Sequence, residues 1–142
     1  MENRLDVITL AVADLEQALA FYRDLGFESK GIVGTEWRDE VTGANGAIAM
    51  FRLDGGMLLN LYSRADLAKD AAIPAARPHS GEFSLAQLVR SRAEVDESLK
   101  KAASAGATVT PAHDRPWGIY SGYFRDPDGH LWEMIWRPSG TS

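Results

Sequence analysis

The sequence predicts an α+β fold built from two βαβββ modules. Two amphipathic helical stretches each end at a glycine, a strand-like stretch precedes each helix, and three strand-like stretches follow each. This order is the same in both halves, which makes it a weak internal repeat. A lone module of about 60 residues would be marginally stable, so we expect the two to pack together as a single domain over residues 1–142.

The first half opens with a strand predicted over residues 5–13, rich in Val, Ile and Thr. Asp14 follows as a helix N-cap, and Gln17 lies three residues later, as in a capping box. Gly26 is expected to end this helix. The apolar stripe of the helix has the spacing i, i+3, i+4, i+7 and consists of Leu15, Ala18, Leu19 and Tyr22. Strands are predicted next over residues 27–33, 47–53 and 57–62.

The second half repeats this order. After a strand predicted over residues 83–90, Ser91 and Glu94 form a Ser-x-x-Glu capping box, and Gly106 is the expected left-handed end of the helix. The apolar stripe consists of Val95, Leu99, Ala102 and Ala103. Strands are predicted next over residues 108–112, 119–125 and 130–136.

The last two strands of each module are expected to form a hairpin. Their turn signals are Asp54-Gly55-Gly56 and Asp126-Pro127-Asp128-Gly129. The pairs Phe51-Arg52 and Phe124-Arg125 precede these turns, and the position nine residues after each Phe is Asn60 or Glu133. Asn60 and Glu133 are therefore predicted to be equivalent.

The modules are placed at residues 4–63 and 82–137. The first is longer between its helix and its hairpin, and the extra residues are assigned to a polar loop, 34–46, that contains Trp37. Residues 64–81, rich in Ala and with Pro74 and Pro78, are predicted to be a linker with one short helical turn near 66–71.

Composition restricts the function classes. Apolar residues make up 45% and charged residues 25%, as in a globular chain. The formal net charge of −5 argues against nucleic acid and anionic membrane surfaces as partners. The sequence has no cysteine, which excludes disulfides and thiol nucleophiles. The N-terminus lacks an apolar signal core and no run approaches the roughly 20 apolar residues of a membrane span, so we expect a cytoplasmic protein.

Four stretches, residues 8–15, 21–27, 91–96 and 123–133, give the chain a specific likeness. It resembles the vicinal oxygen chelate superfamily, which includes glyoxalase I, bleomycin-resistance proteins and extradiol dioxygenases. The resemblance implies a curved, mixed, eight-strand sheet around a cup, with helices on the outer face. It also implies a homodimer, with the cup built within one chain or across a swapped pair of chains.

Enzymes of this superfamily place a divalent metal in the cup. The resemblance implies one ligand from the first strand and one from the last strand of each module, commonly two His and two Glu. The matching positions here are Val7, Asn60, Ser84 and Glu133. Glu133 alone is a strong ligand, because an amide oxygen and a neutral hydroxyl are weak donors and Val offers none. We therefore predict no metal and no other cofactor.

Glu133 has two interpretations. Strand alternation puts it between Leu131 and Ile135 on one face, so it is framed by apolar side chains. In the structural interpretation it is a buried carboxylate satisfied by an Arg or by hydrogen bonds. In the functional interpretation it contacts a ligand or acts as a catalytic base, with Asn60 and Ser84 as ligand-binding hydrogen-bonding groups.

Aromatic residues supply the other candidates. Residues 117–123 contain three aromatic residues and two glycines. Of these, Trp117 and Tyr120 are the candidates for an aromatic surface on which a ligand stacks. Trp37 could complement them on the other side of the cup. The alternative is a core aromatic cluster, which is the favoured interpretation for Tyr123. The three histidines lie outside the ligand positions and are interpreted as surface residues; they are His79, His113 and His130.

Three functions follow from these observations. The favoured one is a protein that binds a small, partly aromatic molecule in the cup without a metal. The alternative is an enzyme: a metal-dependent lyase or isomerase of the lactoylglutathione lyase kind, a dioxygenase, or a metal-free variant with Glu133 as base. The third is a purely structural or regulatory module whose cup is filled by its own side chains.

Overall fold

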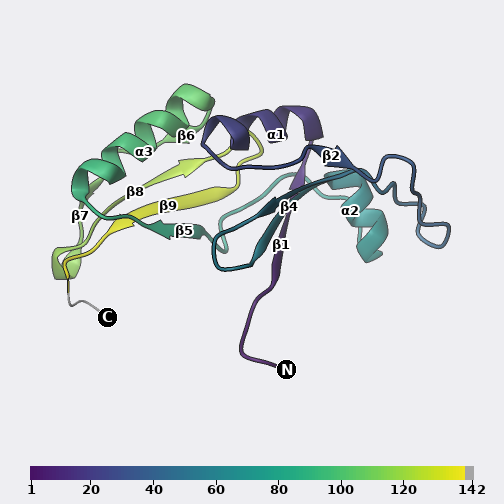
Figure 1. Ribbon diagram of the computed structural model, residues 1–142, viewed down its shortest axis with the longest axis horizontal. Helices are drawn as coiled ribbons and strands as arrows, with labels where there is room; N and C mark the ends of the chain where they lie inside the picture. Colours follow the sequence, from purple (N-terminus) through teal and green to yellow (C-terminus); the bar gives the residue numbers. More distant parts are fainter. Residues whose placement is uncertain (140–142) are drawn as a thin grey trace. The chain divides into compact units, whose positions relative to one another are not determined.

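A computed structural model describes residues 1–139 of the chain. The chain divides into two compact units, the first from Met1 to Arg77 and the second from Pro78 onward. Each unit holds one βαβββ module (Figure 1). The predicted α+β class and the two-module organisation are confirmed. Among the described residues, no helix combines the length and the apolar character needed to cross a membrane.

The first unit contains a four-stranded sheet in the order β1-β4-β3-β2. β1 runs parallel to β4, and the other pairs are antiparallel. The elements are β1 (Val7–Val12), α1 (Leu15–Asp24), β2 (Ile32–Val33), β3 (Ile48–Arg52), β4 (Leu58–Ser63) and α2 (Arg64–Ala71). The strand predicted over residues 27–33 is reduced to two residues, since Gly31 just before it has a φ of 105°.

The second unit contains a five-stranded sheet in the order β5-β9-β8-β6, with β7 also paired to β8. Its elements are β5 (Leu85–Leu88), α3 (Arg92–Ala105), β6 (Thr108–Val109), β7 (His113–Asp114), the short 3-10 helix Pro116–Gly118, β8 (Tyr120–Arg125) and β9 (Leu131–Trp136). The extra strand arises because the strand predicted over 108–112 is split. Pro111, which has no N–H for the ladder, lies between β6 and β7.

The helix caps follow the sequence prediction. The side chain of Asp14 accepts a hydrogen bond from the Gln17 N–H at 3.0 Å, and that of Ser91 accepts one from the Glu94 N–H at 3.0 Å. Gly106 is the C-cap of α3 with a φ of 114°. These local signals fix where α1 and α3 begin and where α3 ends.

The predicted linker is more ordered than expected. In place of one turn near 66–71 it begins with the two-turn helix α2. Ser63 caps this helix, and the buried carboxylate of Asp66 accepts a 2.9 Å hydrogen bond from the Asn45 N–H. A side chain in the first turn of α2 is therefore tied to the 34–46 loop, a long-range contact that the linker's composition does not indicate.

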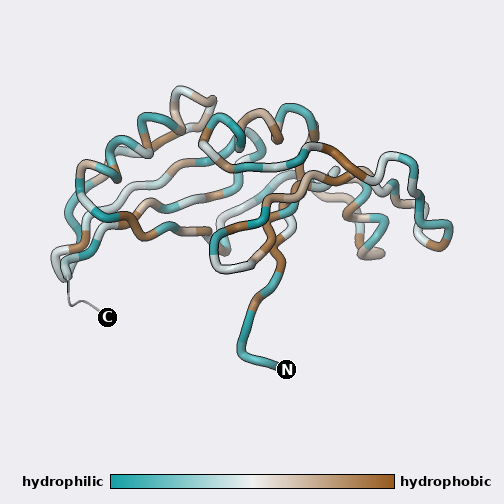
Figure 2. Tube along the Cα trace, in the orientation of Figure 1, coloured by the Kyte–Doolittle hydropathy of each residue, from teal (hydrophilic) through white to brown (hydrophobic). Residues whose placement is uncertain are grey.

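Each module packs a helix on one face of its sheet. In the second unit α3 lies along β8 and β9 (Figure 1), and its trace alternates between hydrophilic and hydrophobic residues (Figure 2). Gly122 allows this close packing, because a Cβ there would lie 2.6 Å from Leu99 Cδ1. In the first unit α1 packs on β3 and β4, and the Tyr22 and Phe51 rings are 6.0 Å apart.

The opposite face of each sheet carries the candidate site. Because side chains alternate along a strand, Ser121, Tyr123 and Glu133 share the face of the second sheet that lies opposite α3. We call this the helix-free face of module two. In module one, Met50 and Asn60 occupy the corresponding face, opposite α1. Buried aromatic and aliphatic residues fill the helix sides, among them Phe51, Leu59, Leu61, Phe124, Trp132 and Met134.

Candidate functional site

Glu133 lies in the middle of the second sheet, half-buried on its helix-free face. Its partner on the antiparallel strand β8 is Tyr123, and its partner on the parallel strand β5 is Ala86. Directly opposed residues have Cβ atoms about 5 Å apart, so these side chains surround the carboxylate.

Two hydroxyl groups point at the Glu133 carboxylate. Ser121 is fully buried and its Oγ donates to Glu133 Oε2 at 2.8 Å. Tyr123 forms a side-chain hydrogen bond with the same carboxylate. Burial, and then this hydrogen bond, raise the pKa of Tyr123 above its ordinary value; the charge of Glu133 adds to the rise and that of Arg115 opposes it. The Tyr123 hydroxyl is therefore a firm donor at neutral pH.

Arg115 completes the group from the turn between β7 and β8. Its guanidinium carbon lies 5.7 Å from the centroid of the Tyr123 ring. Its Nη2 donates to the Ser121 carbonyl oxygen over a long 3.4 Å. Its Nε is buried and has no hydrogen-bond partner among the described residues. Arg115 and Glu133 thus both contact Ser121 and Tyr123 of β8, but they form no ion pair with each other.

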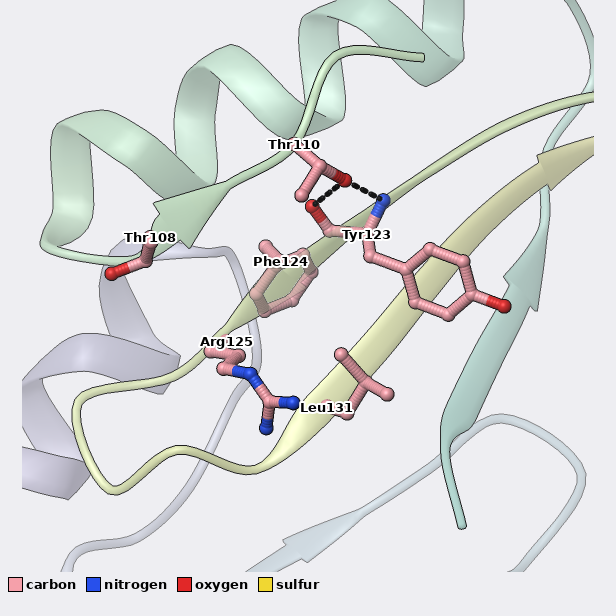
Figure 3. A pocket seen from close by; sticks show the side chains of 6 residues that line it. All are labelled: Thr108, Thr110, Tyr123, Phe124, Arg125 and Leu131. Carbon is pink, nitrogen blue, oxygen red and sulfur yellow. Dashed lines mark hydrogen bonds between the residues drawn. The ribbon is translucent and has the colours of Figure 1, made fainter. Parts of the chain in front are cut away.

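A cavity of about 290 Å³ adjoins this group (Figure 3). Its lining residues are Thr108, Thr110, Tyr123, Phe124, Arg125 and Leu131. The Thr110 hydroxyl bonds to the main-chain N–H and carbonyl of Tyr123, at 3.2 and 3.3 Å, and the Tyr123 ring extends away from Thr110. We call Ser121, Tyr123, Glu133 and Arg115 the Glu133 cluster. Tyr123 therefore belongs both to the cavity and to this cluster. The volume is near the lower end for small-molecule pockets.

Module one has the same arrangement with different chemistry. Asn60 pairs with Met50 on β3 and with Thr9 on β1. Asn60 is 9% exposed, and its Oδ1 has no hydrogen-bond partner among residues 1–139. A depression of about 710 Å³ lies beside Met50, and three of its lining residues, Met50, Arg52 and Leu58, match Tyr123, Arg125 and Leu131 of the module-two cavity in the hairpin register.

The structure also locates the two first-strand positions. Val7 pairs with Leu58 and therefore lies two residues before Thr9, the residue beside Asn60. Ser84 is exposed and precedes β5, two residues before Ala86, the residue beside Glu133. Neither predicted first-strand position lies directly beside its last-strand partner.

The residues at these positions do not fit the divalent metal that the resemblance implies. Val7 has no donor atom, Ser84 offers a neutral hydroxyl, and Asn60 offers an amide oxygen. Glu133 is the one carboxylate of the set, and it already accepts hydrogen bonds from two hydroxyl groups. Within residues 1–139, no three His, Asp or Glu side chains are grouped so that they could hold a metal ion.

The predicted aromatic residues have different surroundings within their own units. Tyr120 lies on the α3 side of the sheet, where its hydroxyl donates to Asp96 at 2.6 Å, so it is on the face opposite Glu133. Trp117 is 85% exposed in the turn after β7, with a φ of 64°. Trp37 is 69% exposed in the first unit. It lies near the start of the 34–46 loop, whose end residues Gly34 and Gly46 approach each other closely.

Sequence reasoning missed three residues of the cluster: Ser121, Tyr123 as a site residue, and Arg115. A signal for the first two was present. The turn Asp126–Gly129 fixes the hairpin register, and counting outward from it pairs Tyr123 with Glu133. No sequence signal identified Arg115, because its position depends on the conformation of the turn that follows it.

A scan against family models matches residues 4–134 to the Glyoxalase/Bleomycin resistance protein/Dioxygenase superfamily. The chain belongs to this superfamily. The predicted resemblance is thereby confirmed, and the paired βαβββ modules are those of its fold. No curated protein sequence matches the chain.

Solved structures of the superfamily resemble the chain over nearly its full length. A glyoxalase-related enzyme from Fulvimarina pelagi is 28% identical with a TM-score of 0.79, covering 96% of this chain and 90% of that one. A lactoylglutathione lyase from Agrobacterium tumefaciens is 27% identical with a TM-score of 0.64, covering 96% and 95%. A fosfomycin resistance protein from Listeria monocytogenes, 22% identical with a TM-score of 0.69 and coverage of 98% and 97%, shares the fold.

Proposed function

We propose that the chain binds a small, partly aromatic molecule on the helix-free face of module two, without a divalent metal. The observation that carries this proposal is the placement of Tyr123. Its ring lines the cavity, and its hydroxyl bonds to Glu133, so one side chain joins an apolar wall to a polar anchor. Leu131 supplies a second apolar surface.

The cavity supports a ligand with one ring. A volume of about 290 Å³ is too small for most drug-sized molecules but holds a phenyl group with a short chain. A ring can stack on Tyr123, since offset aromatic pairs add about 1 kcal/mol to area burial. The polar part of the ligand would contact the Glu133 cluster.

The alternative is an enzyme, and the 27% identical lactoylglutathione lyase favours it. A metal-dependent reaction of that kind would need donors that Val7 and Ser84 do not provide. A metal-free reaction with Glu133 as base remains compatible with the cluster, because a carboxylate held by Ser121 and Tyr123 is fixed in position. Such an enzyme would still bind its substrate at this site. A homodimer, expected from the superfamily, is part of the same proposal.

The test uses 3-phenylpropionamide, a neutral single-ring probe, and calorimetric titration of chelator-treated protein. Leu131→Trp fills the cavity and should weaken binding by about tenfold or more. Leu58→Trp, the matched change in the module-one depression, should leave binding unchanged. Equal loss in both variants, or saturable binding that requires an added metal, would refute the proposal.

A further inference from the structure

Arg115 is a half-buried cation without a charge partner. Its Nε is buried with no acceptor among the described residues, and its Nη2 donates to the Ser121 carbonyl oxygen over 3.4 Å. Within residues 1–139, no ion pair joins a carboxylate to Arg115. A partly desolvated guanidinium with an unmet N–H donor is unfavourable unless an anion satisfies it.

The backbone around Arg115 is firmly held. The Arg115 N–H donates to the Ile119 carbonyl at 2.7 Å, which closes the turn. The preceding residue, Asp114, forms a 2.7 Å ion pair with Arg92 of α3. Pro116 fixes the next backbone angle. The backbone that carries the unpaired guanidinium is therefore fixed. A fixed backbone favours ligand binding, because less conformational entropy is lost when the ligand binds.

The charges near Tyr123 favour an anion. Arg125 is the charged residue of the cavity lining, and its Nη1 is occupied by the carbonyls of Ser80 and Gly129 at 2.6 and 2.7 Å. Glu133 is satisfied by two hydroxyl donors. Tyr123 thus lies between the charges of Glu133 and Arg115, and Arg125 adds a second cation to the cavity lining, in a chain whose net charge is −5. A locally positive site in an acidic protein selects negative ligands.

We propose that Arg115 is the anion-recognition residue of this site, and that the ligand carries a carboxylate beside its ring. Tyr123 lines the cavity and lies under the Arg115 guanidinium, so a ring packed on Tyr123 brings its carboxylate within reach of Arg115. The planar guanidinium matches a carboxylate through two parallel N–H donors, one of them the unused Nε. This inference rests on the proposed function and adds the chemical class of the ligand.

The experiment compares 3-phenylpropionate with 3-phenylpropionamide, which has the same shape without the charge. Calorimetric titration of wild-type protein should show the acid binding about tenfold more tightly than the amide, because a hydrogen bond to a charged group exceeds a neutral one. Arg115→Met keeps the aliphatic stem over Tyr123 and removes the charge. It should reduce the acid-to-amide ratio to about one while the amide affinity stays the same.

Two further variants control this result. Lys101→Gln removes the same charge from an exposed position on α3, on the other face of the sheet, and should keep the ratio. Arg115→Lys keeps the charge without the planar pair of donors, and should recover only part of the preference.

Three outcomes would overturn the inference. If the amide binds wild-type protein as tightly as the acid, the site does not select anions, although the proposed function stands. If neither probe binds, both the inference and the proposed function fail for single-ring ligands. If Arg115→Met instead abolishes self-association measured by sedimentation, the missing anion is a carboxylate of a second copy of the chain.

Discussion

The two modules share a backbone plan but differ at the centre of their sheets. Glu133 of module two is surrounded by donors, because its neighbour on β8 is Tyr123 and Ser121 lies two residues away. Asn60 of module one has Met50 as the corresponding neighbour, and its Oδ1 has no partner among the described residues. The two modules therefore share a fold but not a site. The hydrogen-bonded side chains at the centre of the sheet are found in module two.

The largest difference between the modules should appear when the central polar residue is made apolar. Glu133→Leu leaves the fully buried Ser121 hydroxyl and the Tyr123 hydroxyl without their acceptor, and should lower the free energy of unfolding by about 2–4 kcal/mol. Asn60→Leu removes an amide whose oxygen already lacks a hydrogen-bond partner, and should change the free energy of unfolding by less than about 1 kcal/mol. Urea denaturation measures both. Similar losses in the two variants would show that Asn60 has a partner equivalent to those of Glu133.

A smaller effect is expected on the helix side of the sheets. Gly122 and Ala49 occupy matching positions, but a Cβ at Gly122 would lie 2.6 Å from Leu99 Cδ1 and 3.0 Å from the Ala112 Cα. Gly122→Ala should therefore lower the free energy of unfolding by about 1–2 kcal/mol, although Ala is normally the better residue in a strand. The urea midpoint reports the change, and a stabilised variant would mean that α3 can move away at no cost.

The smallest expected effect concerns the ionisation of Tyr123. The pKa of Tyr123 is raised in the folded protein, so the neutral phenol contributes to the free energy of unfolding. This contribution is fully present below the ordinary tyrosine pKa of about 10 and is lost as the pH rises through the pKa of Tyr123 in the folded protein. Glu133→Gln should lower the pKa of Tyr123 without restoring the ordinary value, since burial is the larger cause. The phenolate absorbance, taken as the difference from Tyr123→Phe, follows this titration. Met50, the module-one counterpart, has no titrating group, so Met50→Leu is the matched control.

Local signals in the sequence predicted most of the fold. The capping residues Asp14 and Ser91 and the terminator Gly106 act within one helical turn, so their effects are independent of the rest of the chain. The break at Pro111 was also a local signal, but the predicted strand ran through it. The helix α2 was underestimated because Asp66 is held by Asn45, which is 21 residues away.

The candidate site was harder to predict than the fold. Asn60 and Glu133 came from the hairpin register, which is set by a tight turn. The same register pairs Tyr123 with Glu133, but an aromatic residue in a strand is more often part of the core, which masked this role. Arg115 could not be found this way, since its guanidinium reaches Tyr123 only through the geometry of the 115–119 turn.

Binding without a metal is tested most directly by the metal content of untagged protein, purified without chelator and measured by elemental analysis alongside Glu133→Gln. We expect well under one equivalent of zinc, nickel, manganese or iron per chain in both proteins, and binding of 3-phenylpropionamide that does not change when a chelator is added. One equivalent of metal in the wild-type chain, lost in Glu133→Gln, would contradict it.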